Sequence, residues 1–91
     1  MKILQAGLFA KQVKKLHKNE KIALDEAIKT IMANPNIGES KKGDLQDVRV
    51  YKYKIKSQQY LLAYLHEEDE IIFLLAHGVH ENFYRNIKKY L

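Results

Sequence analysis

Three lysines, Lys52, Lys54 and Lys56, occupy every second position of one segment. In an extended strand such side chains share a face and lie about 6–7 Å apart, close to the spacing of phosphates along a nucleic-acid strand. Lysine is otherwise depleted in strands, so the pattern favours a role in binding a polyanion. An edge strand whose lysines prevent pairing with other molecules would show the same pattern. The residues alone leave both interpretations open.

The overall charge supports a polyanionic partner only weakly. Lysine and arginine number 16 against 11 for aspartate and glutamate, which gives a formal net charge of +5. Many small proteins carry such an excess for solubility alone. Its distribution is more informative, because basic residues gather at positions 11–18, 41–42 and 49–56, whereas an acidic run at 67–70 is typical of a solvated turn.

Acid–base chemistry in this chain would depend mainly on histidine. The sequence has no cysteine, which excludes disulfides and thiolate chemistry. His77 and His80 are three residues apart, but no third residue has the spacing of a metal ligand, so we expect neither a metal nor another cofactor. A histidine near the start of a helix is more often a capping or surface residue than a catalytic one.

Two amphipathic segments precede the lysines. Apolar residues recur at helical spacing from Phe9 to Leu16 and again from Leu24 to Ile31. Asn19 is a suitable N-cap for the second helix, and Pro35 prevents that helix from running much past residue 33. The pattern predicts an N-terminal helical hairpin that follows a short strand at residues 1–5.

The second half of the chain predicts three strands and a helix. Residues 48–56 alternate in character, whereas residues 60–66 and 70–77 are apolar on both faces, as central strands are. Gly78 is expected to end the third of these strands, and apolar residues return to helical spacing over residues 81–91. In the strand predicted at residues 48–56, the side chains expected to face the helical hairpin are Tyr51, Tyr53 and Ile55. The predicted fold is α+β, with the helical hairpin packed on a small antiparallel meander and a C-terminal helix.

Three segments resemble the RelE/ParE superfamily of toxins from type II toxin–antitoxin modules. They are residues 43–54 (GDLQDVRVYKYK), residues 60–64 (YLLAY) and residues 78–85 (GVHENFYR). The resemblance is closest to the RelE/StbE branch and covers nearly the whole chain, since the predicted order of elements also agrees. It implies one toxin domain over residues 1–91 with a fold like that of microbial ribonucleases.

The resemblance implies one of two toxic activities. RelE-type members cut messenger RNA in the ribosomal A site, whereas ParE-type members inhibit DNA gyrase. We therefore expect a ribosome-dependent endoribonuclease that inhibits translation, with a non-catalytic gyrase inhibitor as the alternative. A non-toxic module of the same fold that binds nucleic acid or a partner protein is a third hypothesis. The implied partners are a cognate antitoxin, mRNA and the ribosome. The expected location is the cytoplasm, because no apolar segment has the length of a membrane span.

The motifs of the superfamily assign roles to individual positions. RelE-type toxins use lysines of the first meander strand and a C-terminal tyrosine in cleavage, and Lys52, Lys54 and Tyr84 match them. Another toxin of the superfamily has a histidine four positions before an aromatic residue, as His80 precedes Tyr84 here. The resemblance therefore assigns catalysis to these four residues. The positions assigned to RNA binding are Lys56, Arg49, Arg85 and His77. One departure is Leu61, which stands where RelE-type toxins have a phosphate-binding arginine.

These residue types suit cleavage of RNA by its own 2′-hydroxyl. That reaction needs a base for the hydroxyl, cations for the developing phosphorane charge and an acid for the departing oxygen. Imidazole titrates near neutral pH, so His80 suits the base or the acid. Lys52 and Lys54 would supply charge, and Tyr84 would stack on a base or donate to the phosphate. No metal is required for these steps.

Overall fold

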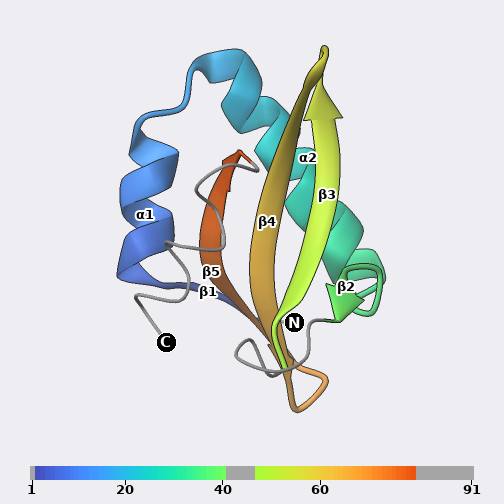
Figure 1. The fold of residues 1–91 in the computed structure, drawn as a ribbon. Coiled ribbons are helices and arrows are strands. Elements are labelled where there is room, and N and C mark those ends of the chain that lie inside the picture. Colours follow the sequence, from blue (N-terminus) through green and yellow to red (C-terminus); the bar gives the residue numbers. More distant parts are fainter. Residues whose placement is uncertain (1, 41–46, 80–91) are drawn as a thin grey trace.

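The computed structural model describes residues 2–40 and 47–79, and Figure 1 shows the arrangement of the elements. In chain order the elements are β1 (Lys2–Gln5), α1 (Gly7–Lys14), α2 (Lys18–Ala33), β2 (Glu39–Ser40), β3 (Arg49–Ile55), β4 (Gln58–Glu67) and β5 (Ile71–Val79). The predicted C-terminal helix and the predicted site residues His80, Tyr84 and Arg85 lie outside the described residues.

The five strands form one mixed sheet in the order β1-β5-β4-β3-β2 (Figure 1). The antiparallel neighbours β3, β4 and β5 confirm the predicted meander, and β4 is its central strand. The strand expected at residues 1–5 is also present, as edge strand β1, and it runs parallel to β5. The sequence pattern does not predict β2, because two polar residues show no periodicity. The α+β class is confirmed.

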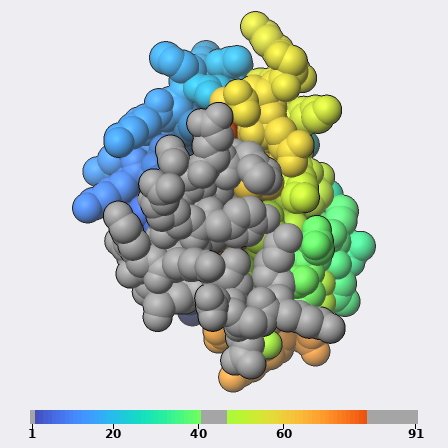
Figure 2. All heavy atoms as spheres, viewed as in Figure 1, coloured from blue at the N-terminus to red at the C-terminus, as the bar shows by residue number. Residues whose placement is uncertain are grey.

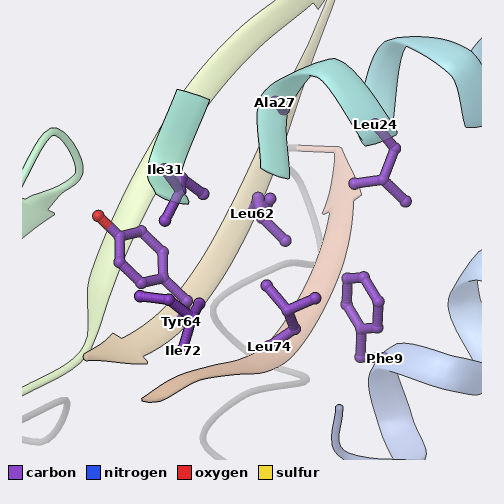
Figure 3. Close-up of a cluster of buried hydrophobic side chains, with 8 residues drawn as sticks. All are labelled: Phe9, Leu24, Ala27, Ile31, Leu62, Tyr64, Ile72 and Leu74. Carbon is purple, nitrogen blue, oxygen red and sulfur yellow. The ribbon is translucent and has the colours of Figure 1, made fainter. Parts of the chain in front are cut away.

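Helix α2 covers one face of this sheet, and the main core lies between them. The members of this core come from both helices and from β4 and β5, and Figure 3 shows them converging: Phe9, Leu24, Ala27, Ile31, Leu62, Tyr64, Ile72 and Leu74. Tyr51 and Tyr53 pack against its margin, so the predicted direction of these two side chains is confirmed. Neither helix of the described part of the chain is long and apolar enough to cross a membrane.

Three predicted boundaries are wrong, each for a local reason. Helix α2 has His17 as its N-cap, because the Glu20 carboxylate accepts a hydrogen bond from the His17 N–H at 2.8 Å, which leaves Asn19 inside the first turn. Strand β5 continues through Gly78, which pairs with Leu61 of β4. Strand β3 ends one residue before Lys56, which lies instead in the turn to β4.

Tyr64 holds the loop that follows α2. Its hydroxyl donates to the Pro35 carbonyl at 2.6 Å and accepts from the Gly38 N–H at 3.0 Å, while its ring is fully buried. A Cβ at position 38 would lie only 2.7 Å from the hydroxyl oxygen, so glycine is required for this close approach. The Arg49 guanidinium donates to the Gly38 carbonyl at 2.9 Å and fastens the same loop to β3.

We expect Tyr64→Phe to lower the free energy of unfolding by about 1–3 kcal/mol, because it leaves a buried N–H without its acceptor and a carbonyl without its donor. Denaturant titration of the purified chain measures this loss. Tyr51→Phe is the matched control, since the structure gives the Tyr51 hydroxyl no partner among the described residues, and it should change stability by less than about 0.5 kcal/mol. Equal stability of Tyr64→Phe and the wild type would contradict the anchoring role.

Candidate functional site

Lys52 and Lys54 project from β3 on the sheet face opposite α2, and both are exposed. We call this surface the lysine face. Lys52 pairs with Leu61 of the neighbouring strand and Lys54 pairs with Gln59, so β4 adds no positive charge beside them. Figure 2 views the sheet from this side, where atoms of β3 and of the turn after it (yellow-green to yellow) form the upper right of the surface.

The buried side chains on the same side of the sheet as the lysine face are apolar. A second cluster of buried side chains lies there and consists of Val48, Val50, Leu61, Ala63 and Ala76. Because these side chains cannot solvate a cation, the ammonium groups extend away from the sheet while their aliphatic stems remain beside it. The face thus offers exposed positive charges on a strand whose neighbouring side chains are buried and apolar.

Lys56 is separated from this row by the backbone. It lies in a two-residue turn with Ser57, between the paired residues Ile55 and Gln58. Its backbone φ is 56°, which lies in the left-handed region that residues other than glycine rarely adopt. The turn tightens the β3–β4 connection, and the strict alternation that placed Lys56 in line with Lys52 and Lys54 ends before it.

Aromatic rings occupy the α2 side of the same strands. Tyr51 and Tyr53 stack with ring centroids 6.2 Å apart, and Tyr53 and Tyr60 with centroids 5.8 Å apart. The next ring is His77 of β5, whose imidazole lies 5.4 Å from the Tyr60 ring and nearly parallel to it, at 7°. We call these four residues the aromatic ladder. The Tyr53 hydroxyl is hydrogen-bonded to Nε2 of His77, so the ladder links β3 to β5 across the central strand.

Both helices hold the ladder in place. The Tyr60 hydroxyl donates to the Glu20 carboxylate at 2.6 Å, and the same carboxylate accepts the N-cap N–H of α2. From α1, the side-chain oxygen Oε1 of Gln12 accepts a hydrogen bond from the backbone N–H of His77 at 2.7 Å. Strand β1 pairs with β5 only as far as Leu74. Beyond that point no strand among residues 2–40 and 47–79 lies on this side of β5, and the side-chain amide of Gln12 serves as the acceptor instead.

Burial decides the protonation of the ladder. It lowers the pKa of His77 to about 4, and the negative charge of Glu20 opposes that change only in part. Burial likewise raises the pKa of Tyr53. The hydrogen bond between Tyr60 and Glu20 raises the pKa of the tyrosine and lowers that of the carboxyl group. At neutral pH the imidazole of His77 and the phenols of Tyr53 and Tyr60 are therefore neutral.

The described residues assigned to the site lie on two sides of the sheet. Lys52 and Lys54 share the lysine face, whereas His77 and Arg49 belong to the α2 side. His77 is only 3% exposed, and Nη1 of Arg49 donates to carbonyls of the loop after α2. Among residues 2–40 and 47–79, no group of three histidine, aspartate or glutamate side chains could hold a metal ion.

Sequence reasoning overlooked the ladder and its anchors. Its signal was present, because Tyr51, Tyr53 and Tyr60 fall on one face as soon as the turn is placed at residues 56–57. Gln12 and Glu20 gave no such signal, since each acts on a residue at least 40 positions away. Polar partners at that separation have no local pattern.

We expect the stability of the protein to fall as the pH drops from about 6.5 to 4. Unfolded His77 takes up a proton near pH 6.5 but folded His77 only near pH 4, so protons favour the unfolded state between these values. A shift of this size corresponds to about 3 kcal/mol, fully present above pH 6.5 and lost towards pH 4. His77→Gln, which keeps a hydrogen-bonding side chain without titrating, should flatten this part of the curve.

Denaturant unfolding at a series of pH values measures this difference between the wild type and His77→Gln. His17→Gln removes an exposed histidine and serves as the control, which should follow the wild type. A pH dependence of His77→Gln that is as steep as that of the wild type would show that other groups cause it.

The comparisons with known proteins agree with this architecture. The sequence model of the ParE-like toxin of type II bacterial toxin–antitoxin systems matches residues 3–88. No curated protein matches the sequence significantly. Solved structures of the Escherichia coli toxin RelE have the same fold, and at about one-fifth identity the likeness concerns the fold alone.

Three of these structures illustrate the likeness. RelE in the intact RelBE toxin–antitoxin complex is 22% identical, with a TM-score of 0.69, and the match covers 88% of this chain and 96% of RelE. The isolated toxin is 21% identical, with a TM-score of 0.66 and coverage of 99% and 98%. A free arginine-substituted variant is 20% identical, with a TM-score of 0.71 and coverage of 97% and 90%. Because the family match extends over residues 3–88, the chain belongs to the ParE-like toxins of type II bacterial toxin–antitoxin systems.

Proposed function

We propose that this toxin is a ribosome-dependent endoribonuclease that cleaves messenger RNA and thereby inhibits translation. The observation that carries the proposal is the lysine face, where two exposed ammonium groups stand side by side on a rigid strand. The RelE-like fold and membership of a toxin family support it. A surface of this kind suits the phosphate backbone of a single RNA strand better than it suits a small neutral ligand.

The aromatic ladder makes the lysine face suitable for catalysis. Tyr53 lies between Lys52 and Lys54 in the sequence, but its side chain points to the α2 side of the sheet, where it is hydrogen-bonded to His77. This contact prevents β3 from rotating or slipping, so the two lysine stems start from fixed positions. Charges that are positioned before the reaction stabilise a developing phosphorane without reorganisation. We assign His77 this positioning role within the site.

The remaining chemistry is assigned to the C-terminal segment. We propose that His80 exchanges the proton of the 2′-hydroxyl or of the leaving oxygen, and that Tyr84 stacks on a base or donates to the scissile phosphate. Lys56 and Arg85 would hold flanking phosphates. In this scheme Lys52 and Lys54 stabilise the transition state, and the reaction proceeds without a metal.

Inhibition of DNA gyrase is the second candidate, and two observations favour it. The matching family is described as ParE-like. In addition, Leu61 stands beside Lys52 on the lysine face and is fully buried, at the position where the resemblance implies a phosphate-binding arginine. With one cation fewer, the face would hold RNA more weakly than that of RelE-type toxins. DNA damage in cells without mRNA cleavage would identify this activity.

An antitoxin is the proposed protein partner. Solved structures show E. coli RelE in complex with the antitoxin RelB and with a RelB peptide. We propose that this chain is held inactive in the same general way, by a segment that folds when it binds the toxin.

We expect the double substitution Lys52→Ala, Lys54→Ala to weaken binding to ribosomes carrying mRNA and to reduce the salt dependence of binding by about one to two units of slope. Thermal stability should hardly change, because both side chains are exposed. Sedimentation with ribosomes at several salt concentrations measures both effects. The control is Lys21→Ala, Lys29→Ala, which removes the same charge from the exposed side of α2. Equal losses of ribosome binding in the two double variants would show that binding depends on net charge alone and not on the lysine face.

We expect His80→Ala to slow cleavage by about 10²–10⁴-fold while ribosome binding persists, as removal of a general acid or base does. Tyr84→Ala should also slow cleavage. Tyr84→Phe separates two roles, because stacking needs only the ring whereas a contact to phosphate needs the hydroxyl. Primer extension on a translated message, at matched concentrations of folded protein, measures all three.

Full cleavage by the variant with both His80→Ala and Tyr84→Ala would remove these residues from the mechanism. Absence of cleavage even by the wild type, together with gyrase-linked DNA damage, would favour the second candidate. Harmless overexpression of the wild type would favour the non-toxic binding module.

A further inference from the structure

A polar pocket lies at the lower end of the sheet in Figure 1, between β2, the start of β3 and the end of β4. Its volume of about 510 Å³ is in the range of sites that hold a small molecule. Consecutive strand residues direct their side chains to opposite faces, so a pocket lined by neighbours in β4 extends round the end of the sheet. The polar residues of the lining are Asn36, Ser40, Asp47, Arg49, His66 and Glu67.

His66 contributes a buried nitrogen that has no partner in the described part of the chain. Solvent does not reach its Nε2, and no described residue forms a hydrogen bond with this atom. Oδ1 of Asp69 is 3.7 Å away, which is beyond hydrogen-bonding distance, and the Asp69 side chain is 98% exposed. Because a buried polar atom without a partner destabilises a protein, a ligand that supplies the partner is favoured.

Arg49 offers a pair of donors in a fixed orientation. Its Nη1 donates to the carbonyls of Asn36 at 3.3 Å and Gly38 at 2.9 Å, which uses both N–H bonds of that nitrogen. Its Nε and Nη2 have no hydrogen-bond partner among residues 2–40 and 47–79. One edge of the guanidinium group is therefore available to a ligand with two adjacent acceptors.

Asp47 and Glu67 supply acceptors to the same pocket. Neither side chain forms a hydrogen bond or an ion pair with another described residue. A carboxylate can accept two hydrogen bonds from a ligand with adjacent donors. The pocket thus combines a bidentate donor with bidentate acceptors.

A guanine base has the complementary set of atoms. Its N7 and O6 are adjacent acceptors that match an arginine, and its N1–H and 2-amino group are adjacent donors that match a carboxylate. Adenine, cytosine and uracil each lack at least one of these pairs. We propose that this pocket binds a guanine base of single-stranded RNA, with Arg49 on the edge of N7 and O6 and a carboxylate of Asp47 or Glu67 on the edge of N1.

Two other classes of ligand fit the pocket less well. A metal ion needs a group of at least three histidine, aspartate or glutamate ligands, and residues 2–40 and 47–79 contain no such group. A phosphate or another small anion would meet two carboxylates against one guanidinium group, and like charges repel. A neutral base with both donors and acceptors avoids this repulsion.

The inference deepens the proposed function and rests on it for the role of the pocket in cleavage. Arg49 precedes Lys52 by three residues, which is about 10 Å along β3. A guanine in the pocket would therefore belong to a nucleotide near those whose phosphates lie on the lysine face. It would give the toxin a preference for guanine close to the cleavage site. Binding of guanine by the pocket does not itself depend on cleavage.

The test measures binding of the full chain to fluorescein-labelled hexanucleotides by fluorescence anisotropy. Their 2′-O-methyl groups prevent cleavage through the 2′-hydroxyl. We expect oligouridine with one central guanine to bind at least tenfold more tightly than oligouridine alone. Inosine lacks the 2-amino group and 7-deazaguanine lacks N7, so each should bind at least threefold more weakly than guanine. Equal binding of all four oligonucleotides would overturn the proposal.

Two double variants locate the guanine. Asp47→Asn, Glu67→Gln preserves the size of both side chains and should reduce the preference for guanine to less than threefold. Glu68→Gln, Glu70→Gln removes the same charge from exposed residues outside the lining and should retain the preference. Arg49 also holds the loop after α2, so 7-deazaguanine tests its contact in place of a substitution. A preference that survives in the first variant would place guanine elsewhere and refute the proposal.

Primer extension measures cleavage separately from binding. A preference for guanine in a toxin that cuts no message would refute only the nuclease. Cleavage by a wild type that binds guanine and uridine oligonucleotides equally would refute only the pocket.

Discussion

The contact between Tyr53 and His77 determines which way β3 faces, and the rest of the site follows from that orientation. Side chains alternate along a strand, so a slip of one residue would turn Lys52 and Lys54 towards α2 and expose the tyrosines. Three partly buried rings could tolerate such a slip if only their apolar area mattered. A hydrogen bond to a buried imidazole cannot, because its loss would leave a polar nitrogen of His77 without a partner in the core. The register is therefore specified by a polar interaction and stabilised by apolar ones.

The burial of His77 reduces the stability of the protein in acid, because the imidazole must remain neutral while the protein is folded. Residues of both helices hold the surroundings of His77 in place. Gln12 satisfies the backbone N–H of His77, and Glu20 holds Tyr60 against the imidazole ring. Each anchor comes from a different helix, so the packing of the helical hairpin and the orientation of the lysine face are parts of one structure. A substitution in either helix near these residues would therefore alter the orientation of the lysine face on the opposite side of the sheet.

The sequence was informative where the structure depends on periodicity or on a local stop signal. Alternation placed Tyr51 and Tyr53 towards the helices, the apolar stripe defined the buried side of α2, and Pro35 ended that helix close to the expected position. It failed where a distant or unusual partner decides. His17 replaces the better N-cap because Glu20 reaches back to it. Lys56 adopts a left-handed turn without the usual glycine or asparagine. Arg49 and His77 are ordinary basic residues in sequence, and only the fold shows the carbonyls and rings that surround them.

The parallel pairing of β1 with β5 has a consequence for the synthesis of the protein. Lys2 lies beside Ile71 and Gln5 beside Leu74, so β1 cannot take its place in the sheet until residue 74 has left the ribosome. Contacts between such distant residues slow folding, because a long loop must close before they contribute any stability. Ile3 packs against the main core, and Ile72 and Leu74 belong to it, so that core is incomplete in a growing chain. A chain that stops before β5 would therefore lack both the pairing partner of β1 and part of the main core.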